Sequence, residues 1–166
     1  MNTIICAPIT ETNANTFLTT IREAEKTADA IELRFDYLPA ESLSQLISKL
    51  SSRPARVGKP LISPFRPREQ GAKGDLSLQD RRDFWPELPP EIAASIAYAD
   101  FEFDLVESYA GEQPPVPWEK VICSWHDFAE TPHDLIARYE LMAGTPAAVV
   151  KIATQANRIG DCLRVF

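Results

Sequence analysis

The strongest constraint on this chain is an alternation of short apolar runs with segments of helical periodicity, repeated six times. Nearly continuous apolar runs are typical of strands buried on both faces, and the segments between them resemble amphipathic helices. Strands that alternate with helices form right-handed crossovers and therefore a parallel sheet. The predicted strands are residues 3–9, 30–37, 60–65, 100–106, 120–125 and 147–153, and the predicted helices are residues 12–27, 40–50, 77–85, 91–97, 131–143 and 154–166.

Two architectures fit this pattern: a doubly wound open sheet and a (β/α)8 barrel of the TIM type. Residues 1–166 are expected to form a single domain, since no linker or repeat divides them. Neither a glycine-rich dinucleotide-binding turn nor a phosphate-binding loop follows any predicted strand, which argues against a nucleotide-binding protein.

Charge and composition exclude several classes of protein. The formal net charge is −7 and no basic run occurs, so a nucleic-acid partner is not expected. No apolar stretch approaches the length of a membrane span, and residues 1–6 do not resemble a secretory leader. The three cysteines are an odd number, and Cys6 and Cys123 lie in apolar runs, which predicts buried free thiols in the cytoplasm. A catalytic thiol at Cys123 is disfavoured, because His126 is predicted to point to the opposite face of the strand.

Polar side chains gather toward the carboxyl ends of five predicted strands. In a parallel α/β barrel these ends converge on one mouth, where such folds place their catalytic groups. Taken one at a time, each group is explained as a structural ion pair, a solvated loop charge or a residue leading into a helix. Their recurrence at five strand ends favours a functional site. The groups are Glu32 with Arg34, Arg66, Glu102 with Asp104, His126 and Lys151.

Lys151 is the most informative of these residues, because it interrupts the apolar run of residues 147–153. Burial disfavours the ammonium form of an amine, and a neutral lysine amine is a nucleophile toward a carbonyl carbon. The alternative is a lysine at a strand end whose stem packs while its ammonium group reaches water.

The chain resembles the type I 3-dehydroquinate dehydratase family in segments that occur in the family's order and extend over the whole chain. The family motifs Glu-Leu-Arg-x-Asp, Ser-x-His-Asp-Phe and Val-Lys-Ile-Ala occur together, which makes the resemblance specific. The matching segments are residues 5–9, 28–37, 59–62 with 65–67, 120–128 and 150–153.

The resemblance implies a TIM-type barrel and a lyase of the shikimate pathway that converts 3-dehydroquinate to 3-dehydroshikimate and water without a metal or organic cofactor. Lys151 would form a Schiff base with the substrate ketone, and His126 would act as general base and then general acid. Glu32, Arg34 and Arg66 match the family's substrate-binding residues.

Two local departures from the family are apparent. Gln70 stands where the family has a glutamate that orients the catalytic histidine, so the support of His126 is in question. Glu102 and Asp104 occur in the reverse order from the family's Asp-x-Glu, and Glu102 remains a candidate for indirect support of the site.

The third departure is length, since about six βα units are recognised where a full barrel has eight in roughly 250 residues. Six strands would leave two open edges. The expected outcomes are a fragment of a longer product, a homodimer that covers the edges, or a weakly stable domain. Two other functions stay open: a non-catalytic binding or assembly module, and another lysine Schiff-base barrel such as an aldolase.

Overall fold

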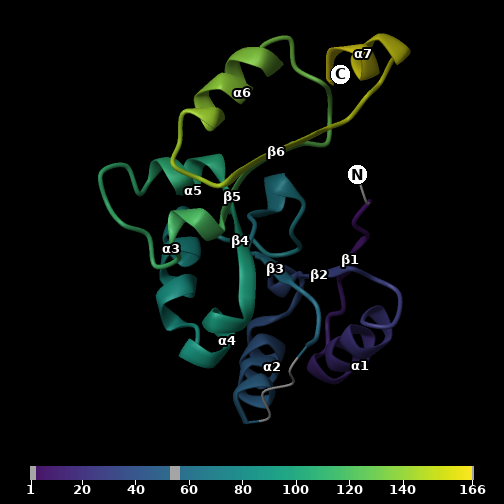
Figure 1. The fold of residues 1–166 in the computed structure, drawn as a ribbon, viewed down its shortest axis with the longest axis vertical. Coiled ribbons are helices and arrows are strands. Elements are labelled where there is room, and N and C mark those ends of the chain that lie inside the picture. The colour runs from purple at the N-terminus through teal and green to yellow at the C-terminus, as the bar shows by residue number, and fades with distance from the viewer. Residues whose placement is uncertain (1–2, 53–56, 166) are drawn as a thin grey trace.

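A six-stranded parallel sheet forms the centre of the protein, in a computed structural model that describes residues 3–52 and 57–165. The strands lie in chain order, so each pairs in parallel with the strand before it, and the sheet curls along its length (Figure 1). Six strands in this order make an incomplete (β/α)8 barrel. They are β1 (Cys6–Ile9), β2 (Ala30–Leu33), β3 (Leu61–Pro64), β4 (Ile96–Glu102), β5 (Val121–Asp127) and β6 (Val149–Thr154).

Helices follow the strands, and several begin and end where the sequence supplies a cap. The Ser77 and Asp80 side chains form a capping box at the start of the third helix, which was predicted over residues 77–85, and Gly144 ends the sixth. The predicted last helix extends to Phe166, which lies outside the described residues. The helices are α1 (Ala14–Ala24), α2 (Ala40–Ser52), α3 (Leu78–Glu87), α4 (Pro90–Ser95), α5 (Phe103–Glu107), α6 (Leu135–Ala143) and α7 (Ile159–Val165), with short 3₁₀ turns η1 (Phe35–Tyr37), η2 (Arg68–Gln70) and η3 (Trp118–Lys120).

Aromatic side chains fill the space between the outer face of the sheet and its helices. The Phe84 ring on α3 stacks on Phe65 with ring centroids 3.9 Å apart, and Trp85 packs 4.9 Å from Phe101 of β4. Phe17 of α1 is fully buried in the same core. Because this apolar core lies on the outer face, the opposite, concave face of the sheet is free to carry polar groups.

The fourth strand begins and ends earlier than the sequence predicted. Residues 100–106 were expected to form it, but β4 spans Ile96–Glu102, and residues 103–107 form α5. The run Ala93-Ala94-Ser95-Ile96-Ala97 suits a helix as well as a strand, so local propensity could not place the boundary. Pairing of Ile96 with Leu61 of β3 decides it. The shift moves Asp104 off the sheet and puts Asp100 beside Glu102.

The two edge strands are more exposed than the sequence suggested. Among the described residues, β1 pairs only with β2 and β6 only with β5. Val149 is exposed and every other residue of β6 is partly exposed, so the prediction that this strand is buried on both faces is wrong. Cys6 on β1 and Cys162 on α7 are also exposed, so the prediction of a buried thiol is confirmed for Cys123 and wrong for Cys6.

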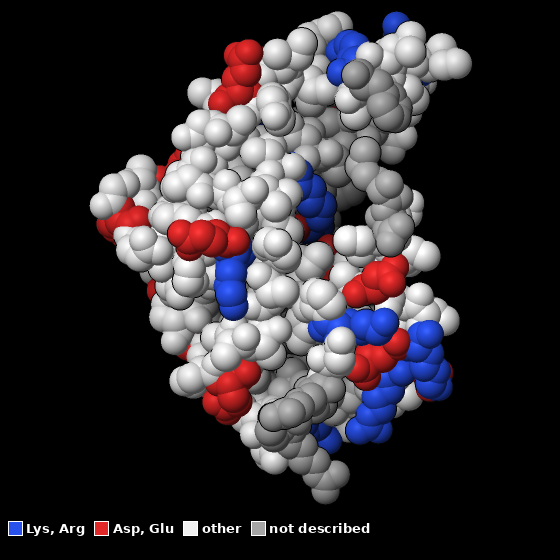
Figure 2. All heavy atoms as spheres, in the orientation of Figure 1, with Lys and Arg blue, Asp and Glu red and all other residues white. Residues whose placement is uncertain are grey.

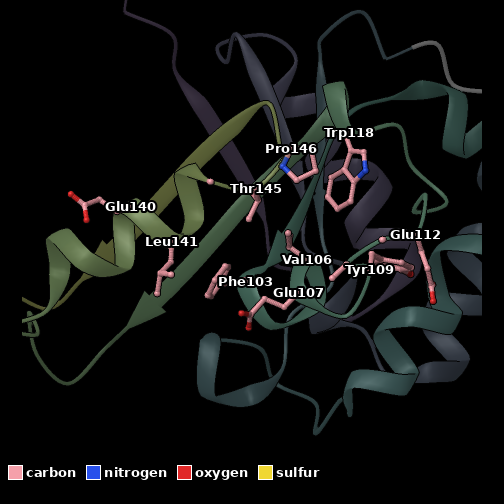
Figure 3. Close-up of a pocket in the computed structure, with 13 residues that line it drawn as sticks. Phe103, Val106, Glu107, Tyr109, Glu112, Trp118, Glu140, Leu141, Thr145 and Pro146 are labelled. Carbon is pink, nitrogen blue, oxygen red and sulfur yellow. The ribbon is translucent and has the colours of Figure 1, made fainter.

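The helix that follows β4 is unusually short, and a cavity lies beside it. Residues 108–117 complete the connection to β5 and contain three prolines, which cannot extend a helix. The cavity has a volume of about 580 Å³ and lies between this connection and the end of α6 (Figure 3). Phe103, Val106, Trp118 and Leu141 form its apolar lining, on the side of the sheet away from the concave face.

Charged side chains of both signs lie among one another on the face shown in Figure 2. None of the helices in residues 3–52 and 57–165 combines the length and apolar character that a membrane crossing requires.

Candidate active site

Strand register gathers a set of polar side chains on the concave face. Glu102 pairs with Ser124 and Ser124 with Lys151, so these residues lie at the same level on β4, β5 and β6. Side chains alternate along a strand, which places Asp100 and His126 on the same face. The prediction that Glu32, Arg66, His126 and Lys151 meet is therefore supported by the geometry around Lys151. Arg34, Arg66 and His126 are buried, and Glu32 is nearly so.

Lys151 lies between carboxylates rather than in apolar surroundings. Its Nζ atom donates a hydrogen bond to Asp100 Oδ2 at 3.0 Å and lies 3.8 Å from Glu32 Oε2. The side chain is 35% exposed, because β6 is an edge strand. The expectation of an amine enclosed by apolar side chains is therefore wrong, and the amine is instead accessible and paired.

Asp100 is the central carboxylate of the site, and the sequence prediction missed it. It is fully buried and accepts a hydrogen bond from Arg66 Nη2 at 2.6 Å as well as the bond from Lys151. Burial favours a raised pKa for the Asp100 carboxyl, but the charges of Arg66 and Lys151 outweigh burial and hold the pKa below its usual range. Asp100 is therefore the ionised partner of Lys151.

The two predicted substrate-binding arginines are largely engaged by the protein itself. The Arg34 guanidinium binds Asp36 through Nε and Nη2 and donates to the Gly71 carbonyl oxygen at 2.8 Å. Arg66 binds Asp100 and lies 4.0 Å from Glu32. Guanidinium groups that are buried and already bound to carboxylates hold those carboxylates in place, and this leaves few donors for a substrate.

His126 lies within β5 rather than after it, and it is buried next to Gln70 of η2. Gln70 Oε1 accepts a hydrogen bond from the backbone N–H of His126 at 3.1 Å and lies 3.4 Å from ring Nδ1. An amide oxygen only accepts, so this contact favours a proton on Nδ1 and leaves Nε2 as a base. Burial, together with the positive charge of Arg66, lowers the pKa of His126 to about 4. The imidazole is therefore neutral at pH 7.

Glu102 lies at the end of β4, where Arg81 of α3 reaches it. Arg81 Nη1 donates to Glu102 Oε2 at 3.1 Å and to Asp104 Oδ1 at 2.9 Å. Burial and the neighbouring Asp100 charge raise the pKa of Glu102 to about 8. The order Asp100-Phe101-Glu102 is the Asp-x-Glu that the family resemblance calls for, so the reversed order inferred from Glu102 and Asp104 is wrong.

Cys123 faces the other side of β5 and does not join the site. Burial raises the pKa of its thiol to about 12, which suppresses the thiolate at neutral pH. The prediction against a catalytic thiol agrees with this environment.

Arg81 was also missed, because a lone arginine in a helical segment carries no signal of a contact with a distant strand. Asp100 could have been found, since it lies two residues before Glu102 and shares its face. The cluster combines an accessible amine, an ionised carboxylate at 3.0 Å and a neutral imidazole. Such a set can form an imine with a carbonyl compound and move a proton at the adjacent carbon.

Chain-ordered parallel strands with polar groups gathered on the concave face define an α/β protein of the (β/α)8-barrel class. The sequence narrows the class further, because the family model of type I 3-dehydroquinase matches residues 5–166. The chain belongs to this family.

Two curated relatives and one solved structure illustrate the similarity. The bifunctional 3-dehydroquinate dehydratase/shikimate dehydrogenase of Arabidopsis thaliana is 31% identical over 98% of this chain and 27% of its own length. The 3-dehydroquinate dehydratase of a Streptococcus pneumoniae strain is 30% identical over 82% of this chain and 58% of its own. The type I 3-dehydroquinate dehydratase of Clostridium difficile, solved with covalent modified comenic acid, superposes with a TM-score of 0.70 at 25% identity, over 96% of this chain and 66% of that one.

Proposed function

We propose that this chain carries the amine and proton-transfer half of a dehydratase site that acts on 3-dehydroquinate through a Schiff base on Lys151. The observation that carries the proposal is the accessible Lys151 amine, 3.0 Å from the buried Asp100 carboxylate, in a chain of the type I 3-dehydroquinase family. The relatives named as 3-dehydroquinate dehydratase support the choice of substrate.

In the proposed mechanism, the neutral Lys151 amine attacks the ketone carbon, and loss of water gives an iminium ion. Asp100 is the counterion of this cation, as it is of the ammonium group. His126, neutral at pH 7, takes a proton from the adjacent carbon, and the electron pair moves into the iminium. His126 then returns the proton to the departing hydroxyl group, and water leaves. Hydrolysis of the product iminium consumes one water and restores the Lys151 amine.

We propose that Glu32, Arg34 and Arg66 form the substrate-binding set, and that they contribute to substrate binding in different ways. Among the described residues, the Glu32 carboxylate has ion-pair contacts of 3.8–4.0 Å but no hydrogen bond, so it is available to substrate hydroxyls. Arg34 and Arg66 act mainly by holding carboxylates in position.

The decisive experiment is borohydride trapping with 3-dehydroquinate, followed by peptide mass spectrometry. We expect a reduced adduct on the peptide that contains Lys151. Lys151→Arg keeps the positive charge but lacks a nucleophilic amine, so it should give none. Absence of an adduct on the wild-type chain at every substrate concentration would refute the Schiff-base proposal.

We expect this chain to form the imine with its substrate more efficiently than it completes the dehydration. These 166 residues span 58% of the Streptococcus pneumoniae relative, and we expect the unmatched part of that relative to contribute further groups that position the substrate. Misplaced substrate reacts slowly even where the catalytic groups are intact, and a loss of about 100-fold or more in kcat/KM is expected. Absorbance of the enone product measures turnover, and rates near those of the longer relatives would contradict the prediction.

A second candidate function is a non-catalytic binding or assembly module. The neutral Gln70 beside His126 and the open edges of the sheet favour it. It predicts that Lys151→Ala leaves the biological behaviour of the protein unchanged, whereas the dehydratase proposal predicts loss of function in a strain that depends on this chain.

A further inference from the structure

The loop after β3, residues 67–75, contains η2 and is tied to the rest of the protein at two points. On one side, Gln70 Oε1 accepts a hydrogen bond from the backbone N–H of His126 on β5 at 3.1 Å. On the other side, the Gly71 carbonyl oxygen accepts a hydrogen bond at 2.8 Å from Nη2 of Arg34, which directly follows β2. Among the described residues, the remaining hydrogen bonds of the loop lie within it. The loop therefore connects β2 and β5, which are not neighbours in the sheet.

Gln70 supplies the acceptor that a neighbouring strand would otherwise provide for His126. The pairing of β4 with β5 stops at Glu102 and Ser124, so β4 does not extend alongside His126. A buried backbone N–H needs an acceptor, and only the oxygen of an amide side chain can accept. This contact fixes Oε1 rather than Nε2 of Gln70 toward His126, and the same oxygen lies 3.4 Å from ring Nδ1. The position of Gln70 therefore decides which ring nitrogen carries the proton.

The contact between Gln70 Oε1 and the ring is sensitive to the position of the loop. At 3.4 Å it is near the upper limit of a hydrogen bond, and a contact of about 3.6 Å no longer is one. Without this acceptor, the neutral ring can carry its proton on Nε2 instead of Nδ1. The Nε2 lone pair that would take a proton from the substrate is then lost.

Arg34 is suited to hold the loop, because its own guanidinium group is fixed in position. Nε donates to Asp36 Oδ1 at 3.0 Å and Nη2 donates to Oδ2 at 2.6 Å, and this two-point contact sets the plane of the group. The Tyr37 ring packs against it, with Cζ of Arg34 4.4 Å from the ring centroid. Arg34 and Asp36 are both buried, which limits competition from water for the bond to Gly71.

We propose that Arg34 is a positioning residue for His126: through the Gly71 carbonyl it holds Gln70 where Nδ1 keeps its proton and Nε2 is free to act as the base. The proposal rests on the proposed role of His126 in proton transfer. It gives Arg34 a role that does not require contact with the substrate, in agreement with a guanidinium group whose hydrogen bonds go to Asp36 and Gly71.

The test measures the tautomer of His126 by NMR in the protein without substrate. Nitrogen chemical shifts distinguish a ring nitrogen that carries a proton from one that does not, and at pH 8 the ring would be neutral even at its ordinary pKa of 6.5. Removal of Arg34 alone would leave the Asp36 carboxylate buried and unpaired, so the test variant is Arg34→Met with Asp36→Asn, and Asp36→Asn alone is its matched control. Relative to this control, we expect the ratio of the Nδ1–H form to the Nε2–H form to fall about three- to ten-fold, as for the loss of one neutral hydrogen bond.

A second comparison shows whether Arg34 acts through Gln70, since the charge of Arg34 also reaches His126 directly through space. Gln70→Leu removes the acceptor and should lower the tautomer ratio at least as much as the double variant does. Addition of Arg34→Met with Asp36→Asn to Gln70→Leu should cause no further change, because the link is already broken. A further fall of similar size would show that Arg34 acts without the loop, and the proposal would be wrong.

An unchanged tautomer ratio in the folded double variant would also overturn the proposal. Thermal unfolding separates positioning from a merely structural role, which would lower stability but leave the ratio unchanged. If the double variant does not fold, Arg34→Lys is compared with the wild type, because lysine keeps the positive charge beside Asp36 but ends one bond short of the position of Nη2. Failure of borohydride trapping in the wild type would overturn the Schiff base alone, since no substrate enters the tautomer measurement.

Discussion

The His126 imidazole is buried beside a cation, and its only close acceptor among the described residues is a neutral amide. Its protonated form is therefore disfavoured. The pKa of His126 is lowered in the folded state, so the unfolded chain binds a proton more readily. The stabilising contribution of His126 to the free energy of unfolding is therefore fully present above pH 6.5 and is lost as the pH falls toward 4.

We expect the C2–H resonance of His126 to titrate in NMR with a midpoint of about 4. Gln70→Glu places a negative charge beside the ring, which favours imidazolium and should raise that midpoint. Exposed His133 gives the second histidine signal, and His126→Asn identifies the first by its disappearance. A wild-type midpoint near 6.5, or no rise in Gln70→Glu, would contradict this account of the site.

Glu102 should make the protein less stable as the pH rises. A carboxyl with a raised pKa in the folded state binds its proton more tightly there than in the unfolded chain. Its stabilising contribution is present below pH 4.5 and lost as the pH rises toward 8. Relative to Glu102→Gln, the wild type should lose up to about 1.4 kcal/mol of unfolding free energy per pH unit in this window.

Urea denaturation at pH 5, 6.5 and 8 measures this difference. Asp104→Asn is the control, because the pKa of Asp104 is lowered below its usual 3.8 and so contributes no slope in this range. A stability difference between wild type and Glu102→Gln that does not change with pH would show that Glu102 is ionised throughout.

The individual site residues differed in how well the sequence predicted them. Glu32, His126 and Lys151 could be found because each lies in a recognisable strand beside a family motif. Asp100 was missed because the strand was placed four residues too late. Arg81 reaches the site only through the packing of α3 against the sheet, and no local pattern encodes that contact.

At the scale of elements, the order of strands and helices was predictable and several boundaries were not. Hydrophobic periodicity identified all six strands, and Ser77 correctly marked the start of α3. The helix predicted at residues 131–143 was expected to begin at Thr131, but the Thr131 hydroxyl contacts Thr154 and the Gln155 carbonyl, and α6 begins at Leu135. Such contacts across the sheet are tertiary, so local sequence could not reveal them.

The turn after η2 contacts the Phe128 ring, and Phe128 in turn packs beside His126, the proposed catalytic histidine. Gly71 has φ +91°, and a Cβ there would lie 2.8 Å from the Phe128 ring, which stacks near His126 with centroids 6.0 Å apart. Gly111 also has a positive φ (+80°), but a Cβ added there would meet no described atom within 4 Å, so Gly111 makes a matched control.

Both Gly71→Ala and Gly111→Ala should lose about 1 kcal/mol of stability from backbone strain. In Gly71→Ala, the new Cβ would clash with the Phe128 ring. The ring is exposed and free to move, so we expect it to rotate away. We therefore expect only Gly71→Ala to change the His126 C2–H chemical shift, and Phe128→Ala to produce a similar change. Equal His126 shifts in the two alanine variants would disprove the link.

At the scale of the whole molecule, the open edges of β1 and β6 favour self-association. Within residues 3–52 and 57–165 no further strand pairs with these edges, and exposed apolar side chains lie at them, such as Ile4 just before β1 and Val149 on β6. We propose a homodimer, with a mass twice the 18.5 kDa of one chain in light scattering. Val149→Lys places a charge at an exposed position of β6 and should weaken the dimer, whereas Leu78→Lys on α3 should not. A monomer at every accessible concentration would count against the proposal.

Strand order that follows chain order also bears on how such a protein is made. Each strand pairs with the one synthesised just before it, so the sheet can grow one βα unit at a time as the chain leaves the ribosome. Every intermediate of that growth ends in a single new edge, and the next unit covers it. A six-stranded sheet is thus one stage of an additive folding process, and β6 is the template on which any further strand would assemble.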